Sequence, residues 1–275
     1  MNRETRITVL GGRGFIGSHL VPHLHRLGYD CRSPERQDES IWTGPLGHVI
    51  YAIGLTADFR SKPLETVESH VCVLHRLIQA ADLQSITYLS STRVYVGGTD
   101  TSENASLQVN PSEPGDLYSL SKLMGESLCL HCGRQAMKVA RLSNVVGLRE
   151  DPDSFVDQLL EEGRRTGKVV FRSRLECKKD YVFIDDAVDL LARIAVSSES
   201  GIYNVAGGEG IENAEIASAL AADMGFEVSV APDALAWGFA PIDISKVKAR
   251  FGFSPRGFRD YFPAFLRSYR NKKGI

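Results

Sequence analysis

The stretch RITVLGGRGFIG, residues 6–17, decides the fold class. Residues 6–10 are an apolar run of strand length, and a glycine-rich turn follows directly. From Phe15 onwards, apolar side chains recur at helical spacing until Gly28, so the pattern predicts a helix over residues 15–27. A strand, a glycine-rich turn and a helix in this order indicate the first unit of an α/β fold.

The same alternation continues through the first half of the chain. Apolar runs of strand length alternate with segments of helical spacing. The expected strands are residues 48–53, 85–91 and 138–144, and the expected helices are residues 63–81 and 118–132. This rhythm predicts a Rossmann-type, doubly wound parallel sheet.

The rhythm changes after Asn144, where shorter strands and further helices predict a smaller C-terminal α/β lobe. The helices are expected near 153–165, 186–197, 213–224 and the C-terminal end, and the strands near 168–172, 181–184 and 202–206. We therefore expect a dinucleotide-binding domain at residues 1–147, rejoined by about 180–204, and a mainly substrate-binding lobe at residues 148–275.

Composition argues against several classes of protein. The 275 residues carry 32 basic and 34 acidic side chains, with no dense run of Lys or Arg, which disfavours nucleic-acid binding. No apolar run approaches the roughly 18 residues of a membrane span, and the first ten residues lack the apolar core of a secretory signal. The five cysteines, with Cys129 and Cys132 as a lone C-x-x-C, predict no metal site and a reducing, cytoplasmic location.

The glycine turn predicts a dinucleotide site. Gly12-x-Gly14-x-x-Gly17 follows a strand and opens a helix, which is the context in which this spacing is informative. The missing side chains allow a tight turn and a close approach of a pyrophosphate, and the helix N-terminus offers free N–H groups. A merely tight strand–helix turn is the alternative. The expected cofactor contacts here are Gly11, Gly14, Phe15, Ile16, Gly17 and Ala52.

An acidic side chain near the end of the second strand would bind the adenine ribose of NAD, and Glu35 lies at about the expected distance. An exposed loop carboxylate is the alternative interpretation of Glu35. Arg32 and Arg36 stand nearby, and either could hold the 2′-phosphate of NADP. NAD is therefore the first expectation, with contacts from Glu35 and Arg36, and NADP remains open.

Hydroxyl side chains gather at the carboxyl end of the strand over residues 85–91. Ser90, Ser91 and Thr92, and then Arg93, follow an apolar run. Ligands of open α/β sheets bind at the carboxyl ends of strands, so this cluster is placed to meet a substrate. A strand end capped by a serine-rich turn is the structural alternative.

Tyr118 and Lys122 lie one turn apart on one face of the expected helix over residues 118–132. A lysine ammonium near a phenol stabilises the phenolate and lowers the pKa of the phenol. Such a tyrosine can exchange a proton with a substrate alcohol near neutral pH. Tyr269 and Lys273 have the same spacing in a charged C-terminal helix, where we expect only a solvated face.

Seven blocks, in order along nearly the whole chain, together resemble the extended short-chain dehydrogenase/reductases. The group concerned is the NAD-dependent epimerase/dehydratase family, which acts on nucleotide sugars. The blocks are GGRGFIG, SSTRVY, YSLSK, RLSNVVG, KKDYVFIDDAVDLL, GIYNVAGGEGI and DISKVKARFGFSP. The resemblance implies Ser91, Tyr118 and Lys122 as catalytic residues, with Tyr118 and Lys122 also touching the cofactor. It further implies a homodimer.

The resemblance also implies a site for a nucleotide sugar. Lys179 stands where the family usually has the arginine that holds the diphosphate, and Arg172 and Arg174 either assist it or are exposed charges. A second family arginine has no counterpart between residues 225 and 245. The expected substrate contacts are Ser91, Thr92, Arg93, Asn144, Arg174 and Lys179.

Three departures from the family pattern refine these expectations. Thr92 and Arg93 stand where the 4,6-dehydratases carry Asp-Glu, which disfavours water elimination. The segment between Glu35 and His48 is too short for the usual third strand. His70 replaces an asparagine beside the cofactor, and we expect it to pack the helix rather than to act as an acid or base.

We therefore expect an NAD(P)-dependent nucleotide-sugar epimerase in which Tyr118 takes a proton from a sugar hydroxyl, at C4, during transient oxidation. An NADPH-dependent reductase of a keto-sugar or another ketone is the first alternative. A non-catalytic cofactor-binding protein is the second. The sequence leaves the sugar, the nucleotide and the stereocentre open.

Overall fold

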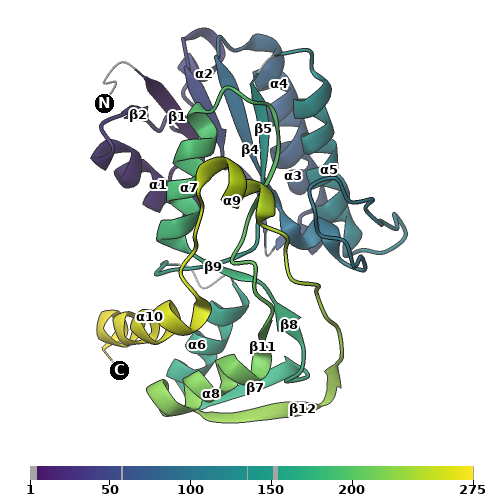
Figure 1. Cartoon of the computed structure of the whole chain (residues 1–275), viewed down its shortest axis with the longest axis vertical. Helices are drawn as coiled ribbons and strands as arrows, with labels where there is room; N and C mark the ends of the chain where they lie inside the picture. The colour runs from purple at the N-terminus through teal and green to yellow at the C-terminus, as the bar shows by residue number, and fades with distance from the viewer. Residues whose placement is uncertain (1–4, 57, 135, 151–153, 275) are drawn as a thin grey trace.

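A six-stranded parallel sheet forms the upper part of the molecule in Figure 1. The computed structural model describes residues 5–56, 58–134, 136–150 and 154–274. Every neighbouring pair of strands in this sheet is parallel, so the predicted Rossmann-type α/β fold is confirmed. In spatial order the strands are β10 (Gly201–Val205), β5 (Met137–Leu142), β4 (Ser85–Ser91), β3 (His48–Tyr51), β1 (Arg6–Leu10) and β2 (Asp30–Arg32).

Helices cover both faces of the sheet (Figure 1). Helices α1 (Phe15–Arg26) and α7 (Ile184–Val196) pack on one face, where Ile7 and Val9 are fully buried. Val49 and Tyr51 are buried on the opposite face. Strands covered on both sides read as continuous apolar runs, as the sequence does here. The opposite face is covered by α3 (Pro63–Val67), α4 (Val73–Ala80) and α5 (Asp116–His131), with α2 (Ser40–Thr43) against α4.

The strand order places a crevice at the carboxyl end of β1. The chain leaves β1 for β2 on one side and then returns to β3 on the other side. Ligands of open α/β sheets bind where the order reverses in this way. The glycine turn that follows β1 lies at this point, against the end of β3. Between β2 and β3 the chain forms only the short α2 and no further strand.

The helix expected over residues 63–81 is present, and a π-helical turn at Glu68–Cys72, which the sequence did not predict, lies between α3 and α4. Two tyrosines from the sheet supply the reason. Tyr51 donates its hydroxyl proton to the Ser69 carbonyl at 2.6 Å, and Tyr88 donates to the His70 carbonyl at 3.3 Å. A wider turn frees carbonyls from the helical ladder, and buried partners here satisfy them.

A second, smaller α/β part lies below the sheet in Figure 1. Its core is a separate cluster of apolar side chains that includes Leu160, Phe171, Leu220 and Phe262. A short parallel pair, β6 (Asn144–Val146) and β9 (Tyr181–Phe183), connects it with the sheet. Its elements are α6 (Phe155–Thr166), β7 (Lys168–Ser173), β8 (Lys178–Lys179), β11 (Ile211–Glu212), α8 (Asn213–Met224), β12 (Glu227–Leu235) and α10 (Phe258–Lys273), while α9 (Ser245–Phe251) packs beside β10.

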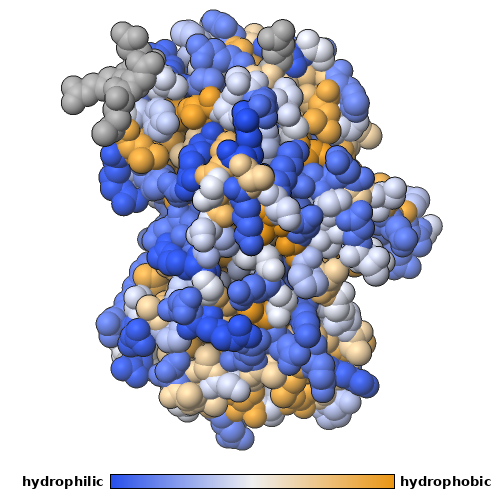
Figure 2. Space-filling view, in the orientation of Figure 1, coloured by the Kyte–Doolittle hydropathy of each residue, from blue (hydrophilic) through white to orange (hydrophobic). Residues whose placement is uncertain are grey.

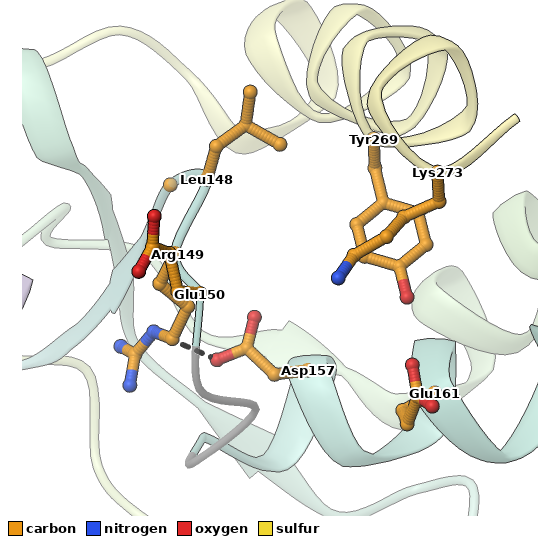
Figure 3. Close-up of a pocket in the computed structure, with 8 residues that line it drawn as sticks. Leu148, Arg149, Glu150, Asp157, Glu161, Tyr269 and Lys273 are labelled. Atoms are coloured by element: carbon orange, nitrogen blue, oxygen red, sulfur yellow. Dashed lines mark ion pairs between the residues drawn. The ribbon is translucent and has the colours of Figure 1, made fainter.

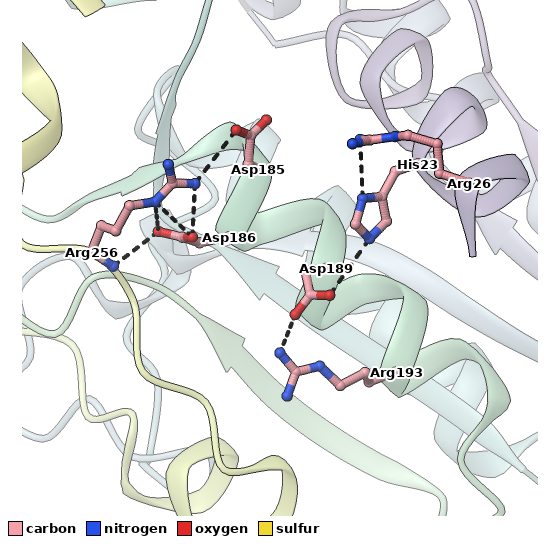
Figure 4. A network of polar contacts seen from close by, with 7 residues as sticks. All are labelled: His23, Arg26, Asp185, Asp186, Asp189, Arg193 and Arg256. Carbon is pink, nitrogen blue, oxygen red and sulfur yellow. Dashed lines mark hydrogen bonds and ion pairs between the residues drawn. The ribbon is translucent and has the colours of Figure 1, made fainter. Parts of the chain in front are cut away.

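Charged side chains on α7 join three segments that are distant in the sequence (Figure 4). Asp186, in the first turn of α7, accepts hydrogen bonds from the backbone and the side chain of Arg256, just before α10. Further along α7, Asp189 pairs with Arg193 and lies 3.5 Å from the imidazole of His23 on α1. The face of the molecule shown in Figure 2 is largely hydrophilic, with small scattered apolar groups. No helix in the described ranges is long and apolar enough to cross a membrane.

Candidate active site

The glycine turn is too tight to accept side chains. Gly11 has a φ of +90°, and a Cβ there would lie 2.7 Å from the carbonyl of Ala52. A Cβ on Gly17 would lie 2.5 Å from the Cα of Gly12. The turn is closed by the N–H of Gly14, which donates to the Gly11 carbonyl at 3.0 Å. Bare backbone at the start of α1 is what a dinucleotide pyrophosphate needs, so these residues fit that cofactor.

A cavity of about 1260 Å³ runs from the glycine turn towards the lower lobe. Pockets for one small molecule usually measure roughly 300–1,000 Å³, so this cavity has room for a cofactor and a substrate together. Most of the residues singled out from the sequence line it. They are Gly14, Phe15, Ile16, Gly17, Ala52, Ser91, Thr92, Arg93, Tyr118, Lys122, Asn144 and Lys179.

The three candidate catalytic residues come from two neighbouring elements. Ser91 ends β4, and Tyr118 and Lys122 lie in the first two turns of α5. Tyr118 and Lys122 are 6% and 5% exposed, so both side chains are shielded from bulk water. The Nζ of Lys122 lies 5.8 Å from the centre of the Tyr118 ring and donates to the Leu89 carbonyl at 2.9 Å.

The environment of Lys122 lowers its pKa to about 7, because burial removes water from the ammonium. Glu126, one turn further along α5, opposes this shift. However, Glu126 is engaged in a buried ion pair with Arg141 at 2.6 Å and accepts the hydroxyl proton of Ser90 at 2.5 Å. Ser90 therefore has a structural role, and the ion pair ties α5 to β5 behind the catalytic face.

His70 packs beside the catalytic helix and is fully buried. Its ring is edge-on to the Tyr118 ring at 5.4 Å between centres. The Nε2 of His70 accepts the N–H of Leu55 at 3.2 Å, so Nδ1 carries the proton and donates to Ser121 Oγ at 2.8 Å. Burial and the nearby Lys122 lower the His70 pKa to about 3, which keeps the imidazole neutral. These contacts agree with a packing role.

Arginine side chains approach Tyr118 from two loops. Phe59 lies 5.3 Å from the Tyr118 ring, between ring centres. The guanidinium groups of Arg60 and Arg93 lie 4.5 and 5.7 Å from the centre of the Phe59 ring. Arg93 also donates its backbone N–H to Ser91 Oγ at 3.2 Å, so it is fixed next to the candidate catalytic hydroxyl.

At the lobe end of the cavity, Lys179 is enclosed by aromatic rings. Its Nζ lies 3.7 Å from the centre of the Phe155 ring and 4.9 Å from that of Trp237. Burial lowers the Lys179 pKa to about 8. Arg172 and Arg174 are exposed and do not line the cavity, and Arg172 lies 3.7 Å from Glu162 instead. The structure therefore brings only Lys179 of these three cations into the cavity.

The residues expected near the adenine ribose lie at the rim rather than in the cavity. Glu35 and Arg36 are exposed and do not line it. Glu35 forms an ion pair with Arg13 of the glycine turn, and Arg13 does line the cavity. Arg32 is directed away, because it donates to Thr8 Oγ1 at 3.1 Å and to the Pro45 carbonyl at 3.3 Å.

Arg149 connects the glycine turn with the lobe. Its guanidinium lies 3.7 Å from the centre of the Phe15 ring, and its Nε lies 3.0 Å from a carboxylate oxygen of Asp157 on α6. Beside it, towards Tyr269 and Lys273 of α10, is a hollow of only about 20 Å³ (Figure 3). A hollow of this size holds about one water molecule. Tyr269 is only 8% exposed and belongs to the apolar core of the lobe, so the expected solvated face is wrong for this residue, whereas Lys273 is exposed.

Several residues that line the cavity escaped the sequence interpretation. Phe59 and Arg60 stand in a short turn without periodicity, and Arg149 follows β6 in a loop. Arg93, in contrast, was expected to contact the substrate, since it directly follows the hydroxyl cluster in the sequence. The described residues contain no group of three or more His, Cys, Asp or Glu side chains that could hold a metal ion.

Comparison with known proteins bears directly on this cavity. The family model described as "NAD dependent epimerase/dehydratase family" matches residues 7–206. The chain belongs to this family. Members of the family are named for the cofactor that the glycine turn fits, and the matched range contains the turn, Ser91, Tyr118 and Lys122.

Relatives with known names have different activities. GDP-6-deoxy-D-mannose reductase of Pseudomonas aeruginosa is 26% identical over 257 residues, covering 83% of each chain. The structure of MoeE5 in complex with UDP-glucose and NAD superposes with a TM-score of 0.83 at 21% identity, covering 97% of this chain and 99% of that one. UDP-glucose 4-epimerase of Thermus thermophilus, in complex with NAD, gives a TM-score of 0.76 at 23% identity, covering 96% and 99%. At these identities the two structures share the family fold with this chain.

Proposed function

We propose that this protein is an NAD(P)-dependent nucleotide-sugar epimerase that transiently oxidises a sugar hydroxyl, at C4. One observation carries the proposal: Ser91, Tyr118 and Lys122 line the same cavity as the bare backbone of Gly14 and Gly17. Proton exchange and dinucleotide binding therefore share one enclosed space. The 4,6-dehydratase activity is disfavoured by Thr92 and Arg93, which supply no carboxylate for water elimination.

In the proposed reaction, Tyr118 accepts the proton of the substrate hydroxyl. When bound, NAD supplies an acceptor for the hydride that leaves the same carbon, and it returns that hydride later. Ser91 donates a hydrogen bond to the oxygen as it becomes a carbonyl. Lys122 holds its positive charge near the Tyr118 ring and stabilises the phenolate. After the keto-sugar presents its other face, return of the hydride to that face of the carbonyl carbon would invert the centre, and Tyr118 returns the proton to the oxygen.

The remaining expectations belong to the same proposal. Residues 1–147, rejoined by about 180–204, bind the cofactor, and residues 148–275 mainly bind the substrate. Asn144 and Lys179, which line the cavity at the lobe end, hold the sugar and the diphosphate. Lys179 neutralises a phosphate as a point charge but lacks the fork of an arginine. We propose a cytoplasmic homodimer.

A keto-sugar reductase that consumes NADPH is the second candidate, and one contact favours it. Glu35, which would bind the ribose hydroxyls of NAD, is neutralised by Arg13. Arg13 and Arg36 thus leave net positive charge at the rim, where a 2′-phosphate would lie. The reductase of Pseudomonas aeruginosa among the relatives is consistent with this alternative.

The two candidates differ in what happens to the hydride. An epimerase recycles it, so the purified protein should release NAD on denaturation and interconvert NDP-sugar epimers without net consumption of cofactor. A reductase should oxidise one NADPH for each keto-sugar reduced. Cofactor identification by mass spectrometry, followed by epimer exchange on a panel of NDP-hexoses and NDP-uronates, distinguishes them. If the wild-type protein neither exchanges epimers on this panel nor oxidises NADPH with keto-sugars, both proposed activities are wrong.

A further inference from the structure

Arg60 and Arg93 come from different loops, line the same cavity and converge near Gly115. Arg60 ends a 3₁₀ turn, Asp58–Arg60, before α3, and Arg93 lies in the 3₁₀ turn Thr92–Tyr95 after β4. Their Nη2 atoms lie 3.6 and 3.4 Å from the position that a Cβ on Gly115 would occupy. Both guanidinium groups also lie against the Phe59 ring.

The charge of this pair is not balanced by the protein. No carboxylate in the described ranges forms an ion pair with Arg60 or Arg93. Asp58, in the same turn as Arg60, pairs with Lys62 at 2.9 Å, and Asp116 accepts the backbone N–H of Asn110 at 2.8 Å. The Nε atom of Arg93 is buried and has no hydrogen-bond partner.

Arg60 is exposed and Arg93 is half-buried, so the cost of leaving the pair without an anion falls mainly on Arg93. Like charges repel, and the buried Nε–H of Arg93, which has no acceptor, loses the hydrogen bond it makes in water. Consistent with this, burial and the neighbouring Arg60 lower the pKa of Arg93, while Asp116 opposes the shift only in part. A bound carboxylate would accept hydrogen bonds from both forks at once.

We propose that Arg60 and Arg93 bind a carboxylate on the sugar ring, so that the substrate is a nucleotide-linked uronate. This inference rests on the proposed function. The backbone N–H of Arg93 donates to Ser91 Oγ, so the Arg93 side chain begins close to the hydroxyl that would bind the substrate oxygen. In a pyranuronate the carboxylate is attached to the carbon next to C4. The diphosphate is attached across the ring at C1, where Lys179 at the lobe end is better placed.

The experiment compares uronates with hexoses that are otherwise identical. Wild type, Arg60→Gln, Arg93→Gln and Arg93→Lys are assayed with UDP-glucuronate and UDP-glucose, and with the corresponding GDP- and dTDP-linked pairs. Arg165→Gln, on the exposed surface of α6, is the matched control. We expect wild type to prefer the uronate, and each Gln variant to lose about 10- to 100-fold in kcat/KM for the uronate. The loss in kcat/KM should be clearly larger for the uronate than for the hexose in each Gln variant, and Arg93→Lys should lie between wild type and Arg93→Gln. Arg165→Gln should change neither value.

Binding to a Tyr118→Phe background, measured by calorimetry, separates recognition from chemistry. There the Gln substitutions should lower the binding affinity for the uronate by a similar factor and lower the affinity for the hexose clearly less. If wild type prefers the hexose, or if the Gln variants lower the affinity for both sugars equally, the proposed carboxylate site is wrong. The proposed epimerase would be unaffected by either result. Absence of turnover and of binding with every pair would instead overturn the proposed function, and this inference with it.

Discussion

The Nδ1 atom of His70 lies 2.8 Å from Ser121 Oγ, inside the Tyr-x-x-x-Lys segment of α5. Ser121 in turn donates to the carbonyl of Tyr118 at 2.8 Å. The π-helical turn that carries His70 therefore contacts α5, which carries the candidate residues Tyr118 and Lys122, through this imidazole. Because this imidazole stays neutral, its contribution is geometric rather than acid–base.

Replacement of His70 by glutamine should preserve the pH dependence of kcat. Glutamine offers a donor and an acceptor in a similar volume, whereas His70→Leu leaves the Leu55 N–H without an acceptor and should destabilise the fold by about 1–3 kcal/mol. The measurements are kcat between pH 5 and 9 and urea unfolding. A limb of the pH profile that disappears in His70→Gln would show that His70 titrates during the reaction.

Tyr118→Phe should lose turnover while it retains the cofactor. Removal of the hydroxyl removes the group that exchanges the substrate proton, and such groups contribute roughly 10²- to 10⁴-fold to rate. The ring keeps its contacts with Phe59 and His70, so the fold should be preserved. Epimer exchange and the cofactor content of the purified protein are the readouts. Full turnover by this variant would exclude the proposed role of Tyr118.

Gly17→Ala should prevent dinucleotide binding. Its Cβ would lie 2.5 Å from the Cα of Gly12, so the turn must open at the place where the pyrophosphate of the cofactor approaches the protein backbone. Gly238→Ala is the control, since a Cβ there meets no atom within 4 Å. Fluorescence titration with NADH and thermal unfolding should separate lost binding from lost folding. Unchanged affinity in Gly17→Ala would contradict the proposed cofactor site.

Glu126→Gln should destabilise the protein strongly. Glu126 is 3% exposed and forms an ion pair with Arg141, so the substitution leaves a buried guanidinium without its counter-charge. Loss of one partner from such a pair costs about 3–5 kcal/mol. Chemical denaturation measures the change, and Glu199→Gln, which breaks the exposed pair with Arg250, should have little effect. Equal effects of the two substitutions would be incompatible with this role of Glu126.

Lys138 should make the protein more stable as the pH rises from about 8 to 10.5. This lysine is fully buried, and burial lowers its folded-state pKa to about 8 from the ordinary 10.5. In that window the unfolded chain binds a proton that the folded chain does not, so the free energy of unfolding increases with pH, by about 3 kcal/mol at most. The free energy of unfolding of wild type and Lys138→Met, measured by denaturation at pH 7 and 10, isolates this contribution. The same change with pH in both proteins would contradict it. Lys248→Met, at an exposed lysine, is the control.

Sequence reasoning worked best where function requires a local pattern. The glycine turn and the Tyr-x-x-x-Lys spacing fix backbone shape or a helix face within a few residues, and all four of Gly14, Gly17, Tyr118 and Lys122 line the cavity. It did not reveal features that depend on distant partners. The π-helical turn inside the expected helix over residues 63–81 accepts hydrogen bonds from hydroxyls of two sheet strands, which no local periodicity reveals.

The same distinction explains the missed and misplaced site residues. Arg60 is brought to Arg93 only by tertiary packing on Phe59, so its place in a featureless loop gave no signal. Arg174 is close to Lys179 in the sequence, yet its side chain is exposed and does not line the cavity. Proximity along the chain therefore did not predict which cations face the substrate.

One guanidinium, that of Arg149, touches both Phe15 at the start of α1 and Asp157 in the first turn of α6. Asp157 also completes the capping box of α6 with Ser154. A ligand that contacts Phe15 can therefore affect, through Arg149 and Asp157, the first turn of α6, which lines the lobe end of the cavity. We therefore expect a dinucleotide bound against Phe15 to favour binding of the sugar, so the cofactor-free protein should bind NDP-sugars more weakly than the cofactor-bound protein in calorimetry.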